Sequence, residues 1–213
     1  MTASEQIKTT PAGRAGNSGK QAGKKRELAL HTLAALSELG FARLNLREVA
    51  ARSGASLGSI HYYFSDKAEL LAYCLRLYKE GFVAHLDELI DGAGDLATLV
   101  RLIPDALAEA IEQHGPTHRL WYDVRAQAMF DPAFRPVVDE IESQLIDVAG
   151  RFLARARALG SRNAAPDALD FYLMLDAWFR YGLQQRLGGN ADAGGLLRSR
   201  LRELEPLFAP TPG

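Results

Sequence analysis

Residues 46–67 read LREVAARSGASLGSIHYYFSDK, and this stretch decides the fold. It predicts two short helices joined by a tight turn, because Gly54 tolerates the positive φ that such a turn requires. The small side chain of Ala50 lets the two helices approach where they cross. Ile60 lies six residues after the glycine and should fill the core from the second helix, against Val49 and Leu46. This spacing is typical of a helix-turn-helix.

Capping residues mark where the helices of this stretch begin. Asn45 with Glu48 three residues later predicts an N-cap and capping box for a helix over 46–53. Ser56 is the next candidate N-cap, for a helix over 57–63. The polar run at 65–67 then opens a longer helix that should continue to about residue 90.

The second helix of the motif leaves small and hydrogen-bonding side chains partly outward. Such a helix can enter the major groove of duplex DNA and meet base edges and phosphates. Arg47, at the start of the preceding helix, can reach a phosphate or can be a solvated charge. The two tyrosines before Phe64 can contact DNA or belong to the core. The candidate DNA-binding residues here are Arg47, Ser56, Leu57, Gly58, Ser59, His61, Tyr62 and Tyr63.

Outside this motif, every periodic segment also predicts a helix, so the fold class is all-α. Glycines and prolines separate the segments, and no strand-like alternation is present. Residues 1–23 are polar and glycine-rich, which predicts a disordered basic arm before a DNA-binding domain at 24–67 and a helical domain at 68–208. About nine helices are expected, over 24–39, 46–53, 57–63, 66–90, 96–113, 117–130, 132–159, 167–187 and 193–207.

Charge and composition favour a cytoplasmic protein that presents one end to a polyanion. Residues 1–67 carry ten basic and five acidic side chains, whereas the remainder carries fifteen basic and twenty-one acidic ones. No apolar run reaches the roughly 20 residues of a membrane span, and the N-terminus lacks the apolar core of a secretory signal. The single cysteine, Cys74, excludes an internal disulfide. We therefore expect no membrane partner.

The whole stretch from Gly40-Phe41 through LREVA, SGASLGSIHYYF and SDKAELL resembles the signature of the tetracycline-repressor (TetR) family. The resemblance covers about residues 24–72. It implies that the helix over 57–63 reads the major groove, that Tyr62 and Tyr63 fall on contact positions, and that Lys67 grips a phosphate. Two residues depart from the family pattern: Asn45 replaces the usual Ser or Thr cap, and His61 stands where Tyr is usual.

For the helical body, the resemblance implies a cavity for a small-molecule effector and a homodimer formed through the last two helices. A dimer would place two reading heads on a pseudo-palindromic operator. Aromatic and polar residues on shared helical faces are candidates for the cavity, although each can equally be bundle core or dimer seam. The candidate ligand-binding residues are Phe82, His85, Trp121, Arg125, Phe171, Met174, Trp178 and Tyr181.

Two other classes of function compete with a ligand-released regulator. An enzyme is disfavoured, because the histidines are scattered and Gly115-Pro116 breaks the one helix that would align His114 with His118. We predict no catalytic residues, no metal site and no cofactor. The other class is a DNA-binding protein that needs no effector and acts through a partner protein. A cavity in the helical body favours the effector, and a filled core favours the partner.

Overall fold

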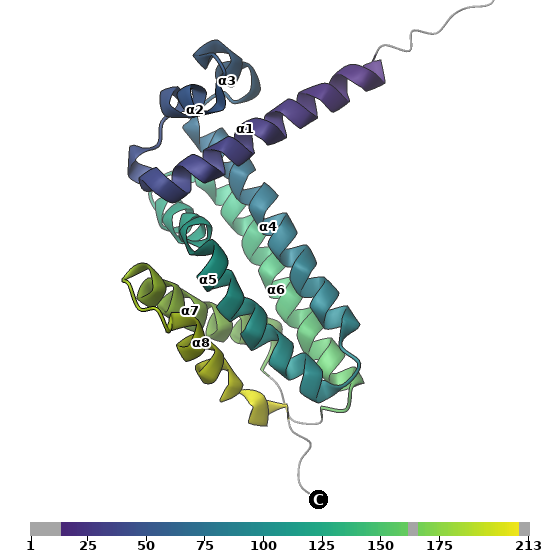
Figure 1. Ribbon diagram of the computed structural model, residues 1–213. Coiled ribbons are helices and arrows are strands. Elements are labelled where there is room, and N and C mark those ends of the chain that lie inside the picture. The colour runs from purple at the N-terminus through teal and green to yellow at the C-terminus, as the bar shows by residue number, and fades with distance from the viewer. Residues whose placement is uncertain (1–13, 162–165, 209–213) are drawn as a thin grey trace, which may run out of the picture.

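The computed structural model describes residues 14–161 and 166–208, and within them the chain is helical with no strand. Helices α1, α2 and α3 and the start of α4 form one end of the molecule, which we call the head (Figure 1). Helices α4, α5 and α6 run along the rest of the molecule, the body, where α7 and α8 cover α5. The fold class predicted from the sequence is therefore confirmed. The helices are α1 (Arg14–Arg43), α2 (Leu46–Ser53), α3 (Leu57–Tyr63), α4 (Lys67–Gly92), α5 (Leu96–Gln127), α6 (Arg135–Ala158), α7 (Ala168–Leu187) and α8 (Ala193–Arg202), with 3₁₀ turns η1 (Pro132–Phe134) and η2 (Glu205–Leu207).

Side-chain caps set the helix starts around the turn motif. Asn45 Oδ1 accepts a hydrogen bond from the Glu48 amide at 3.0 Å, and Ser56 Oγ accepts one from the Ser59 amide at 3.0 Å. Gly54 ends α2 in the left-handed conformation with φ 65°. Each cap satisfies an amide that the helix itself leaves without a partner.

The two helices predicted over 96–113 and 117–130 are joined into one element, α5. Its only non-helical residue is His114, with φ −127° and ψ 21°, two positions before Pro116. Proline lacks the amide hydrogen and its ring crowds the preceding turn, which bends the helix there without ending it. With α5 taken as two limbs, the described residues contain nine α-helical segments, as the sequence predicts.

The C-terminal part of the predicted arm, residues 14–23, overlaps the first helix of the structure. Residues 14–23 are the first turns of α1, and only 1–13 of the proposed arm lie outside the described residues. Lys20, Gln21 and Ala22 are good helix formers, so they can extend the helix that follows. Gln21 also donates a side-chain hydrogen bond to the Tyr62 hydroxyl of α3, which anchors the extension to the head.

Two apolar clusters form the core, and α5 belongs to both. Leu120, Trp121 and Val124 of its second limb pack with residues of α1 to α4 in the head cluster. Ile103 and Ile111 of its first limb pack with α6, α7 and α8 in the body cluster. No helix in the described part of the chain combines the length and apolar character that crossing a membrane requires.

Candidate functional site

The α2–turn–α3 unit presents a polar surface at the end of the molecule. Ile60 and Val49 are fully buried beneath it, and Gly58, His61 and Tyr62 of α3 face outward. Tyr62 is 66% exposed, and its ring lies edge-on to that of Tyr63 with centroids 4.9 Å apart. Of the other candidates, Arg47, Ser56, Gly58 and His61 are exposed, and Leu57, Ser59, Tyr63 and Lys67 are half-buried.

Lys67 stands at the start of α4 but is partly engaged inside the protein. Its ammonium donates a hydrogen bond of 2.8 Å to the Phe41 carbonyl and lies 4.7 Å from the centroid of the Phe41 ring. Partial burial lowers the pKa of this lysine. An ammonium has three donors, so this contact leaves donors for a phosphate. Lys67 therefore links the end of α1 to the start of α4 in addition to its predicted role at DNA.

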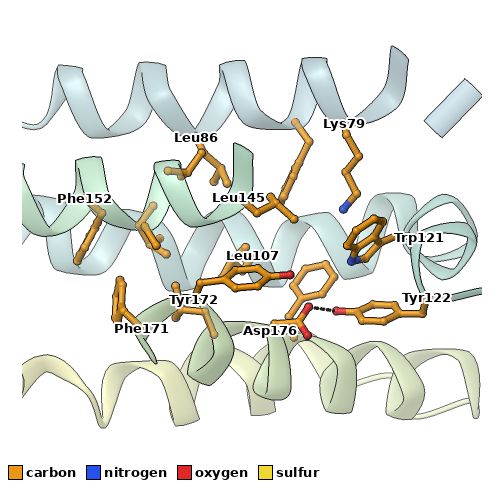
Figure 2. A pocket seen from close by; sticks show the side chains of 16 residues that line it. Lys79, Leu86, Leu107, Trp121, Tyr122, Leu145, Phe152, Phe171, Tyr172 and Asp176 are labelled. Atoms are coloured by element: carbon orange, nitrogen blue, oxygen red, sulfur yellow. Dashed lines mark hydrogen bonds between the residues drawn. The ribbon is translucent and has the colours of Figure 1, made fainter. Parts of the chain in front are cut away.

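The helical body contains a cavity of about 70 Å³ between α4, α5, α6 and α7 (Figure 2). Three of the predicted ligand-binding residues, Phe82, Trp121 and Phe171, line it. Their rings and neighbouring leucines make most of the wall apolar. The two charged residues in the wall are Lys79 from α4 and Asp176 from α7.

Arg125, another predicted ligand-binding residue, does not line this cavity. Its guanidinium donates to Asp176 Oδ2 at 2.8 Å and to Glu142, and so lies between two carboxylates. The Tyr122 hydroxyl donates to the other oxygen of Asp176 at 2.9 Å. The Tyr172 hydroxyl approaches Glu142 at 3.4 Å. The guanidinium and the two hydroxyls supply hydrogen-bond donors to both carboxylates, the group keeps one net negative charge, and Arg125 lies behind the wall.

The other four predicted ligand-binding residues also lie away from this cavity. His85 is exposed on α4, because the cavity-facing side of that helix passes through Phe82 and Leu86 and turns His85 toward solvent. Met174 packs against the body core. Trp178 and Tyr181 pair edge-on at 6.2 Å and border a shallow depression with Arg200 of α8.

Lys79, the most unusual side chain of the cavity, is not among the residues predicted from the sequence. It is 2% exposed, and its Nζ lies 5.2 Å from the Phe82 ring centroid and 5.3 Å from that of Trp121. Burial lowers its pKa to about 7, partly opposed by the charge of Asp176. Its burial could have been predicted from its position on the apolar stripe of α4, four residues after Leu75 and three before Phe82.

His118 is buried beside the cavity among aromatic rings. Three rings surround it edge-on, those of Tyr78, Phe82 and Phe179, at 4.8–5.1 Å between centroids. Burial lowers its pKa well below the ordinary range, so the imidazole is neutral. Among the residues that the structure describes, no three His, Cys, Asp or Glu side chains gather as metal ligands would.

Comparisons with known proteins find relatives of this sequence and of this fold. Residues 31–74 match the family model described as "Bacterial regulatory proteins, tetR family". The regulator BetI of Pseudomonas fluorescens is 27% identical over 118 residues, which span 54% of this chain and 59% of that relative. The chain thus spans about three-fifths of the length of that relative.

Solved structures match over nearly the whole fold. A TetR transcription regulator from Haloarcula marismortui superposes with a TM-score of 0.75 at 20% identity, covering 88% of this chain and 98% of the other. A putative regulator from Saccharomonospora viridis in complex with choline gives a TM-score of 0.70 at 18% identity, covering 86% and 95%. At these identities the likeness shows the fold. The matched turn motif and the relatives together show that residues 31–74 form a DNA-binding segment of the tetR family, and the described chain has the fold of the solved TetR regulators.

Proposed function

We propose that the protein is a transcriptional repressor that binds an operator through α2 and α3 and is released by a small molecule in the body cavity. The exposed polar face of α3, above a core sealed by Ile60, suits the major groove. Release by a small molecule requires that the cavity be mechanically connected to that face.

Trp121 connects the cavity to the DNA-binding head, because it belongs both to the cavity wall and to the head cluster. Its side chain is 1% exposed and forms part of the cavity wall, yet it packs within the head cluster that includes α1 and α4. A ligand that displaces the Trp121 ring must therefore also move the second limb of α5 against the head. Close-packed interiors transmit such shifts, because they leave little free volume to absorb them.

We further propose that two copies associate through α7 and α8. Leu169, Leu173 and Ala177 form an exposed stripe along α7 at intervals of four residues, and Tyr181 continues it. Such a stripe on one helical face is costly to leave in water. A two-fold dimer would hold two α3 helices at a fixed spacing, which the effector alters.

The competing functions have less support. The cavity favours an effector over a partner-only regulator, in which a filled core is expected. An enzyme has no support from the cavity, because its two charged wall residues are a lysine without a described acid partner and an aspartate already bound by Arg125 and Tyr122. A DNA-binding regulator of this kind works in the cytoplasm.

Fluorescence and operator binding together test the proposal. In a Trp178→Phe background, Trp121 becomes the only tryptophan and reports ligands that enter the cavity. A screen of metabolites should yield ligands that change its emission and also weaken operator affinity, by roughly 5–150-fold for a coupling of ~1–3 kcal/mol. A ligand that changes the emission but leaves operator affinity unaltered would refute release by this cavity.

A further inference from the structure

Lys79 is the one charged wall residue of the cavity whose charge the described residues leave unpaired. No carboxylate among them lies within ion-pair distance of its ammonium, although the side chain is 2% exposed. Figure 2 shows the side chain reaching from α4 toward Trp121, with its nitrogen at the tip. A buried ammonium without a counter-ion is unfavourable, so the site gains stability from any anion that can reach it.

The acidic groups of the cavity are already occupied. Both oxygens of Asp176 accept hydrogen bonds, from Arg125 at 2.8 Å and from Tyr122 at 2.9 Å. Glu142 accepts from the same guanidinium and from Tyr172. An incoming cation would therefore have to compete with Arg125 and the two tyrosine hydroxyls for these oxygens.

The aromatic faces are occupied as well. The Lys79 ammonium lies within about 5 Å of the Phe82 and Trp121 rings, the position that a ligand's cationic group would take in an aromatic cage. A second positive charge there would meet the first at close range and without water between them. Repulsion of like charges in such a site costs several kcal/mol.

Resting on the proposed function, the geometry points to a compact carboxylic acid with an apolar body as the effector, its carboxylate bound by Lys79. The apolar wall beyond the lysine, with Leu86, Leu145 and Phe171, receives the body of the ligand. The cavity of about 70 Å³ is smaller than the apolar cavity of about 150 Å³ that holds a benzene molecule, so a branched body fits only by displacing wall side chains such as the Trp121 ring. This preference is opposite to that of the choline-bound structural neighbour.

Four molecules of nearly one shape test this preference: 3,3-dimethylbutanoate, 3,3-dimethyl-1-butanol, choline and glycine betaine. Each is titrated into the full chain carrying Trp178→Phe, and binding is followed by Trp121 emission and by calorimetry. We expect 3,3-dimethylbutanoate to bind most tightly, because it alone combines a carboxylate with an uncharged body. Tighter binding of choline or glycine betaine, or failure of the acid to bind, would overturn the inference.

A Lys79→Met variant tests the role of the lysine itself. Methionine keeps the length and apolar stem but removes the charge. The acid should bind roughly 10–150-fold more weakly, as expected for losing a hydrogen bond between charged groups. The neutral alcohol serves as the internal control and should bind the variant at least as well as the parent. Equal loss of both ligands would contradict a specific carboxylate contact.

Failure of this inference is distinguishable from failure of the proposed function. If the protein protects an operator and a cavity ligand releases it, but that ligand is cationic, only the effector class is wrong. If no operator is bound at all, the proposed function itself falls, whichever of the four molecules the cavity prefers.

Discussion

Replacing Lys67 by methionine should destabilise the protein even in the absence of DNA. The substitution keeps the apolar stem but removes the donor that reaches the Phe41 carbonyl at 2.8 Å and the charge that lies 4.7 Å from the Phe41 ring. A hydrogen bond from a charged donor contributes about 1.5–3 kcal/mol and a cation–π contact at an exposed site about 0.5–1 kcal/mol. Because the side chain is only half-buried, we expect the total to be about 2 kcal/mol.

Thermal unfolding followed by circular dichroism measures this loss. A chain of this length loses about 2–4 °C in Tm per kcal/mol, so Lys67→Met should melt about 4–8 °C below the parent. Lys24→Met is the matched control, because Lys24 is half-buried like Lys67 but its described partner is Glu27 on the same helix. An unchanged Tm for Lys67→Met would refute the argument that this lysine ties α1 to α4.

The same variant also tests the predicted phosphate contact. In titrations at several salt concentrations, the dependence of affinity on salt should become shallower by about one phosphate contact, alike on operator and random DNA. A slope and affinity equal to those of the parent would show that Lys67 is only structural.

Three further predictions concern α3, α7 and the cavity. Tyr62→Ala should weaken operator binding and cost no helical signal beyond fraying of the first turns of α1, which Gln21 holds against the Tyr62 hydroxyl, because the ring is 66% exposed; a larger loss of helical signal would assign Tyr62 to the core. Leu173→Glu should convert a dimer to a monomer in sedimentation, whereas the control Leu30→Glu, at an equally exposed leucine of α1, should not; a dimer in both would exclude the α7 face. Between pH 7 and 10.5 the free energy of unfolding in urea should rise for the parent relative to Lys79→Met. The reason is that the unfolded chain still holds a proton on Lys79 that the folded chain, with a pKa of about 7, has released. A constant difference between the two proteins over this pH range would contradict this.

Local signals in the sequence were sufficient to predict the helices and the turn in the head of the molecule. The caps at Asn45 and Ser56 and the positive φ of Gly54 are properties of single residues and their neighbours, so spacing alone predicts the turn. The start of α1 was harder to predict. Its first turns are held by Gln21 against Tyr62, a contact across forty-one residues that no local pattern contains.

The cavity could be predicted only in part, for a similar reason. Phe82, Trp121 and Phe171 lie on apolar stripes that face the cavity, whereas Trp178 and Tyr181 belong to a neighbouring stripe of α7 that borders Arg200 of α8. Which stripe faces the core depends on how α8 packs, and the sequence of one helix does not contain that information. Lys79 was overlooked because a lysine is usually solvated, and its burial follows from four helices meeting around it.

Footprinting on the DNA upstream of the protein's own gene tests the central claim most directly. If α3 reads the major groove in a two-fold dimer, the purified protein should protect an inverted repeat whose half-sites lie about one helical turn, ~34–36 Å, or a small multiple of that distance apart. A monomer in solution that protects no inverted repeat at moderate salt would contradict the account.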